Sequence, residues 1–363
     1  MVAIVGSLAI IIGAVYLLAI ITDSFFIISL DQISRKLNLS DEVAGASLMA
    51  MGSSAPELAI ALIALFSEGG AHSDVGVGAI VGSAVFNILV ITGVSAVVAN
   101  GLHIHMFAVR RDTAYYLLSI AYLAFIFSDG QVVLWEAIIG LVAYAIYVIM
   151  LAVWKAPEEP EEERERKVAE AEPYPAQTDN LFRKMEAAIV RVIKMITGAP
   201  NENYVWTFFV AIVFIIILSY ILVEATLVFS AGIGIPPVIV ALTLLAAGTS
   251  APDLISSIEV AKEGRGGMAV ANAIGSDIFD VFIGLGFPWV VAIVLLSESS
   301  IIIDVGDLWV SIGILVATTL VLYVFLHTKR ELSRNEGIIL LLLYAAFAIY
   351  TIVAGAGAPP PIH

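Results

Sequence analysis

The chain contains about ten stretches that are each long and apolar enough to cross a lipid bilayer, for which roughly 20 mostly apolar residues are needed. The stretches, numbered here as spans 1 to 10, cover residues 3–29, 42–66, 75–98, 106–128, 131–153, 205–230, 236–260, 267–296, 306–327 and 336–355. Five precede residue 154 and five follow residue 204. The pattern predicts an all-α polytopic membrane protein.

The composition excludes several other classes of protein. Hydrophobic residues make up 60% of the chain and charged residues 13%, about half the charged share of a soluble domain. The net charge of −15 argues against a nucleic-acid partner. There is no cysteine, which excludes disulfides and thiol catalysis. We expect a lipid bilayer as the surroundings, and no enzyme activity, resident cofactor or protein partner.

The basic residues predict the orientation. All 17 lysines and arginines lie in or beside the loops that follow the odd-numbered spans. Because cytoplasmic loops are enriched in these residues, we expect a multi-pass protein of the cell membrane with both termini outside and the central linker cytoplasmic. Each half has an odd number of spans, so homologous halves must be inverted relative to each other.

The long polar segment in the middle divides the chain into three parts. We expect a first five-helix repeat at 1–153, a cytoplasmic linker at 154–204 and a second, inverted repeat at 205–363. Residues 155–177 are rich in glutamate and proline and predict a flexible linker. Residues 179–197 predict an amphipathic helix, either on the cytoplasmic leaflet or packed on the protein.

Two short motifs occur in both halves in the same order. GSSAPE (52–57) recurs as GTSAPD (248–253), and GSAVFN (82–87) recurs as GSDIFD (275–280). The offsets between the two copies are nearly equal, which indicates an internal duplication.

Prolines within two apolar spans predict broken helices. Pro56 and Pro252 lack an N–H, so the carbonyls of Gly52 and Gly248 lose their helical partners. Broken helices at membrane depth occur where they are buried or line a polar cavity. Freed carbonyls there are suitable ligands for a hard cation.

Oxygen-bearing side chains lie beside both breaks. Carboxylates, an amide and hydroxyls are ligands suited to calcium, and no soft donor is present. The pairs are Ser54 with Glu57, Ser250 with Asp253, Ser83 with Asn87, and Ser276 with Asp280. The carboxylates could instead bond neighbouring helices, but three of them at matched positions of a repeat favour an ion site. The hydroxyl residues could also be small residues for helix packing. Asp277 is left out of the site, because its counterpart is Ala84 and we place it on another face.

At these motifs the sequence resembles the alpha repeats of the sodium/calcium exchanger family, within the calcium/cation antiporter superfamily. The resemblance implies a secondary active antiporter that exchanges sodium for calcium by alternating access. It implies that Glu57 and Asp253 bind calcium with the backbone carbonyls of Ser53 and Thr249. Sodium would use these acids with Ser54, Ser250, Ser83 and Ser276, the carbonyls of Ala50 and Ala246 would form flanking sites, and Asn87 and Asp280 would complete the centre.

Two alternatives remain open. Asp280 resembles the potassium-dependent branch of the family, but prokaryotic members also carry aspartate there, so potassium is a possible third ion. A calcium/proton antiporter of the same superfamily is the alternative function. Those proteins typically carry histidine after the repeat acid, whereas Leu58 and Leu254 follow here, which favours sodium.

Overall fold

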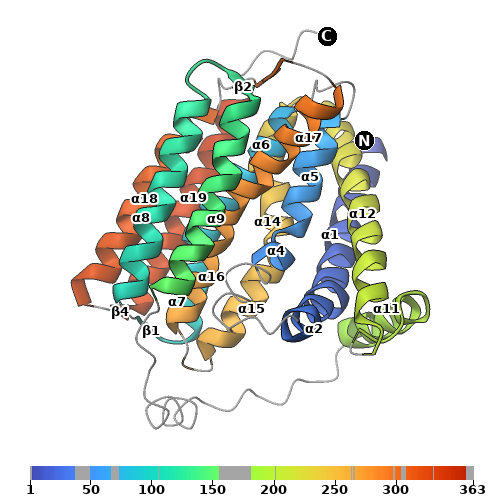
Figure 1. Ribbon diagram of the computed structural model, residues 1–363, viewed down its shortest axis with the longest axis horizontal. Coiled ribbons are helices and arrows are strands. Elements are labelled where there is room, and N and C mark those ends of the chain that lie inside the picture. The colour runs from blue at the N-terminus through green and yellow to red at the C-terminus, as the bar shows by residue number, and fades with distance from the viewer. Residues whose placement is uncertain are drawn as a thin grey trace.

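A computed structural model describes most of the chain (Figure 1). The described residues are 2–36, 50–66, 73–104, 106–154, 181–200, 202–262, 264, 266–296, 299–303, 308–329 and 331–356. The glutamate- and proline-rich segment 155–177, residues 179–180 and the predicted start of span 2 at 42–49 lie outside them.

The first half consists of helices, some of them joined by π-helical turns, and two very short strands. Its elements are α1 (Val2–Ile21), η1 (Thr22–Ile27), α2 (Ile28–Lys36), α4 (Ala50–Ser53), α5 (Ala55–Phe66), α6 (Ser73–Phe86), η4 (Asn87–Ile91), α7 (Thr92–Val98), β1 (Leu102–His103), α8 (Met106–Ile126), β2 (Gln131–Val133) and α9 (Leu134–Val153). The labels η denote π-helical turns.

The second half follows α11 (Leu181–Thr197) and repeats this order. Its elements are α12 (Tyr204–Ile233), α13 (Pro237–Val240), η5 (Ala241–Leu245), α14 (Ala246–Thr249), α15 (Ala251–Lys262), α16 (Gly266–Phe279), η6 (Asp280–Leu285), α17 (Gly286–Leu296), β3 (Ser300–Ile302), α18 (Leu308–Lys329), β4 (Glu331–Leu332) and α19 (Arg334–Ala356). The predicted all-α polytopic fold is confirmed.

Helices occupy the positions of all ten predicted spans. Within the described residues, seven helices are long and apolar enough to cross a bilayer, and the pair α13–α14 and α15 is an eighth candidate with a 41° bend. The other two positions are the broken α4–α5, whose start is not described, and α8, which carries Arg110, Arg111 and Asp112 in its first turns. These charges lower the apolar character of α8 without shortening it.

Two small ladders show that the halves are inverted. β1, after span 3, pairs with β4, after span 9, and β2, after span 4, pairs with β3, after span 8. The two ladders lie at opposite ends of the helix bundle (Figure 1). Equivalent connections, which follow span 3 in one half and span 8 in the other, therefore lie at opposite ends.

Burial separates a central layer from an outer one. The apolar 18-residue stretch of the continuous helix α6–η4–α7 is wholly buried inside the protein. In α1, α9, α12 and α19, one third or less of the corresponding stretch is buried. Large apolar side chains such as Val142, Ile146 and Ile149 of α9 are exposed on the outside. Exposed apolar area of this extent is typical of a surface that faces lipid.

The inverted counterparts α1 and α12 pack along each other at one side of the bundle (Figure 1). The helix α11 lies at the end of this pair and contacts both. Ile193 of α11 is buried, while Val192, Met195 and Ile196 are exposed. One side of α11 therefore packs on the protein, and another side exposes apolar side chains.

Candidate ion-binding site

Both predicted broken helices are present. Ser54 forms a turn between α4 and α5, and Ser250 forms the same turn between α14 and α15. Pro56 and Pro252 are the second residues of α5 and α15, a place where proline is tolerated because the N–H has no partner there in any case. The backbone resumes helical bonding at once, since Leu58 N donates to Ser54 O (3.1 Å) and Leu254 N donates to Ser250 O (3.0 Å).

The breaks bring the two repeats together at the centre of the protein. α6 contacts α14 of the opposite repeat, α16 contacts α4, and η6 contacts both α5 and α6. The ten polar residues predicted from the sequence are all buried: Ser53, Ser54, Glu57, Ser83, Asn87, Thr249, Ser250, Asp253, Ser276 and Asp280. Ala50 and Ala246 are the first residues of the short helices α4 and α14.

Hydroxyl pairs link the repeats in both directions. Ser83 Oγ of the first half lies 2.8 Å from Ser250 Oγ of the second. Ser276 Oγ of the second half lies 3.4 Å from Ser53 Oγ of the first. Each pair joins the central helix of one repeat to the helix break of the other.

The acidic side chains are almost wholly removed from solvent. Glu57 and Asp280 are each 1% exposed and Asp253 is 3% exposed. Within the described residues, neither carboxylate oxygen of Glu57 has a hydrogen-bond partner, and the same is true of Asp280 Oδ1. Buried carboxylates are costly unless they are paired or bind a cation.

The part of the chain that the structure describes places no buried basic side chain beside these acids. Among the buried polar side chains of the described residues, there is neither a lysine nor an arginine. A cation bound from solution would supply the positive charge that these side chains lack. In the described part of the chain, no three Asp, Glu or His side chains converge on one point, so an ion would draw on hydroxyl, amide and carbonyl oxygens as well.

The expectation that Asp277 lies on another face, away from the site, is wrong. Asp277 lies in the site, is 0% exposed, and accepts a hydrogen bond from Asn87 Nδ2 (2.8 Å). The signal was present, because residues three apart share a helix face and Asp277 is three residues before Asp280. Asn272 was also missed; its Nδ2 donates to Asp253 Oδ1 (3.3 Å).

Two further residues, Ala246 and Glu224, lie in surroundings that bear on the site. The carbonyl of Ala246 accepts hydrogen bonds from Ser250 N (3.1 Å) and Thr249 Oγ1 (3.3 Å). Glu224, which the sequence places within span 6, points outward and is exposed. It takes no part in the buried cluster.

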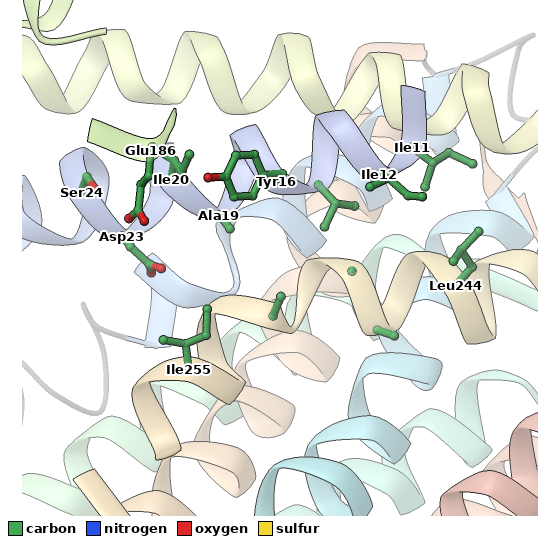
Figure 2. A pocket seen from close by; sticks show the side chains of 14 residues that line it. Ile11, Ile12, Tyr16, Ala19, Ile20, Asp23, Ser24, Glu186, Leu244 and Ile255 are labelled. Carbon is green, nitrogen blue, oxygen red and sulfur yellow. The ribbon is translucent and has the colours of Figure 1, made fainter. Parts of the chain in front are cut away.

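A cavity of about 500 Å³ lies between α1 and the second helix break. Its walls are mostly apolar, and Gly248 and Ala251 line it beside the turn at Ser250. Asp23, Ser24 and Glu186 lie at one end, toward α11 (Figure 2). The cavity therefore reaches from the α11 end of the molecule to the helix break.

Comparison with known proteins identifies the family. A model of the family described as sodium/calcium exchanger protein matches residues 7–153 and 203–353, most of the chain. The chain belongs to this family. The two matched stretches flank the linker and contain both copies of the repeat motifs.

Curated relatives and solved structures resemble the chain over most of its length. The mouse protein named sodium/potassium/calcium exchanger 4 is 27% identical, over 94% of this chain and 80% of its own. The crystal structure of the H+/Ca2+ exchanger CAX has a TM-score of 0.66 at 15% identity and covers 97% of this chain and 85% of its own. The sodium-calcium exchanger NCX_Mj, soaked with Na+ and Sr2+, has a TM-score of 0.57 at 23% identity, over 96% and 99%. The chain therefore has the same fold as these two structures.

Proposed function

We propose that this chain is a secondary active antiporter that exchanges sodium for calcium across a membrane, and that it catalyses no covalent chemistry. One observation carries the proposal. Buried carboxylates meet at two inverted helix breaks with no buried lysine or arginine among the described residues. Mobile cations would supply the positive charge that such a cluster lacks. The family and the named activities of its relatives support sodium and calcium as those cations.

In this proposal Glu57 and Asp253 are the acids that bind both ions. Asp280 and Asn87 complete the centre, with the hydroxyls of Ser54, Ser83, Ser250 and Ser276 as further ligands. The backbone carbonyls of Ser53 and Thr249 serve calcium, and those of Ala50 and Ala246 serve flanking sodium ions.

Alternating access would come from movement of α1 and α12 against the rest of the bundle. Support comes from their packing as inverted counterparts at one side, and from the cavity that separates α1 from the second helix break. We further propose that the α11 end is cytoplasmic and that both termini lie outside, as the distribution of basic residues predicts.

The test is calcium uptake into proteoliposomes that contain the purified protein. Outward gradients of sodium, potassium and protons are imposed one at a time. We expect the sodium gradient to drive calcium uptake and a proton gradient alone to drive none. Uptake driven by protons without sodium would replace this function with calcium/proton antiport. Addition of potassium on the calcium side decides whether potassium is carried too.

Sodium and calcium are expected to compete, because they share Glu57 and Asp253. A few carboxylates in a low-dielectric site neutralise one divalent ion or a small set of monovalent ions, but not both. Raising sodium should therefore raise the apparent calcium Kd progressively, without the plateau that two separate, coupled sites would show. Calcium titrations of the detergent-solubilised protein at several sodium concentrations measure this. A calcium affinity that does not change with sodium would mean separate sites.

A further inference from the structure

Asp277 has no place in the ligand set above, yet it is one of the most deeply buried acids of the protein. It lies on α16 of the second repeat, and its Oδ1 accepts a hydrogen bond from Nδ2 of Asn87, which begins η4 in the first repeat. The distance is 2.8 Å, and both side chains are 0% exposed. The contact therefore crosses between the repeats inside the candidate site.

The chemistry of the amide makes this contact directional. An asparagine side chain has a donor end, the NH₂, and an acceptor end, the carbonyl oxygen. In the structure the donor end faces Asp277, whose Oδ1 accepts the hydrogen bond. Asp277 therefore fixes which way the Asn87 amide is turned, and Oδ1 points away from Asp277. Within the described residues, Asn87 Oδ1 has no hydrogen-bond partner although it is buried.

The inverted repeat supplies an internal comparison. The counterpart of Asn87 is Asp280, and the counterpart of Asp277 is Ala84. The amide of Asn87 could face a cation with either its NH₂ or its oxygen, and only the oxygen can bind it. This amide has an acidic neighbour, Asp277, across the repeat interface. The carboxylate of Asp280 has two equivalent oxygens and needs no such neighbour, and the equivalent position is an alanine.

We propose that Asp277 is a positioning residue that holds the amide nitrogen of Asn87 and so presents Asn87 Oδ1 to the transported cation. The inference rests on the proposed function, since the cation is the one that Glu57 and Asp280 bind. Asp277 acts through Asn87. Carboxylates that orient a metal ligand in this way typically change metal affinity by about 10- to 100-fold when they are removed.

The experiment compares Asp277→Ala, Asp277→Asn, Asn87→Ala and the double variant Asp277→Ala/Asn87→Ala. Calcium chloride is titrated into each purified protein, and KM and kcat for calcium are measured in proteoliposomes. We expect Asp277→Ala to raise the calcium Kd and KM by about 10- to 100-fold. Asp277→Asn should recover most of the affinity, because its amide oxygen can accept the same hydrogen bond. In the Asn87→Ala background, Asp277→Ala should have no further effect.

Three results would overturn the inference. If Asp277→Asn raises the calcium Kd as much as Asp277→Ala does, the charge of Asp277 matters rather than its hydrogen bond. Additive losses in the double variant would show that Asp277 acts independently of Asn87. Unchanged calcium affinity in Asp277→Ala would show that it does not act on the site. If Asp277→Ala is not recovered folded, Asp277→Val takes its place, because valine fills more of the space than alanine and has no acceptor.

Failure of the proposed function would look different. Calcium binding is measured without a sodium gradient, so the cycle between Asp277 and Asn87 can be read even if sodium drives no transport. A wild-type protein that binds calcium but does not exchange it for sodium would refute the exchanger proposal alone. Asp129→Asn, a change to an exposed acid in the turn after α8, is the control for general effects of losing one charge.

Discussion

The Glu57→Gln variant is expected to lose sodium-driven calcium uptake, by on the order of 100-fold or more. The substitution keeps the shape of the side chain and removes its charge. Glu57 is 1% exposed and, within the described residues, both of its carboxylate oxygens lack a hydrogen-bond partner. A neutral amide there leaves a bound divalent ion under-compensated in a site from which water is excluded. Calcium flux in proteoliposomes measures the loss.

Folding is expected to survive this change, because it removes an unpaired buried charge rather than a packing contact. Thermal unfolding in detergent without calcium or sodium should therefore give the variant a midpoint no lower than that of the wild type. Asp129→Asn is the matched control and should transport normally. Wild-type calcium flux from folded Glu57→Gln protein would remove Glu57 from the site.

The Gly82→Ala variant should be strongly destabilised. A Cβ atom at position 82 would collide with the carbonyl oxygen of Leu242 and lie 2.7 Å from its carbonyl carbon and Cα. These are main-chain atoms of η5, which cannot rotate aside. Overpacking of this kind costs about 1–3 kcal/mol and sometimes more, and it would separate α6 from the helix that leads to the Ser250 turn.

Thermal unfolding of the detergent-solubilised protein measures this effect, at roughly 1–2 °C per kcal/mol for a chain of 363 residues. Gly313→Ala is the matched control, because it is the same change on the exposed face of α18 and its Cβ would meet no heavy atom within 4 Å. It should leave the midpoint unchanged or raise it, since alanine is the better helix former. Equal midpoints for Gly82→Ala and wild type would mean that α6 and η5 are not so closely packed.

The spans, the breaks and most of the site were predictable, because the bilayer imposes one length and one polarity on every crossing segment. A proline or carboxylate inside such a segment departs from that background and is therefore conspicuous. The same reasoning identified Glu57, Asp253 and Asp280, because an ionisable residue at membrane depth is energetically costly and is usually functional.

The remaining features depend on local backbone geometry and on contacts between the halves. η4 and η6 begin at Asn87 and Asp280, and such π-helical turns occur frequently at functional sites but have no period that a sequence reveals. The error at Asp277 came from comparing it with Ala84 in the other repeat, when its partner is Asn87 across the interface.

The pairing of Asp277 with Asn87 has no equivalent at Ala84 and Asp280, so the two halves are not exact copies. A carrier with identical halves would half-saturate at the same ion concentration on either face. With the symmetry broken inside the ion site, the inward- and outward-open forms differ in energy and in affinity. The ion gradients alone still decide which way net exchange runs. The asymmetry instead sets how dilute calcium can be on each face and still load the carrier, so that one protein can serve a calcium-poor and a calcium-rich compartment.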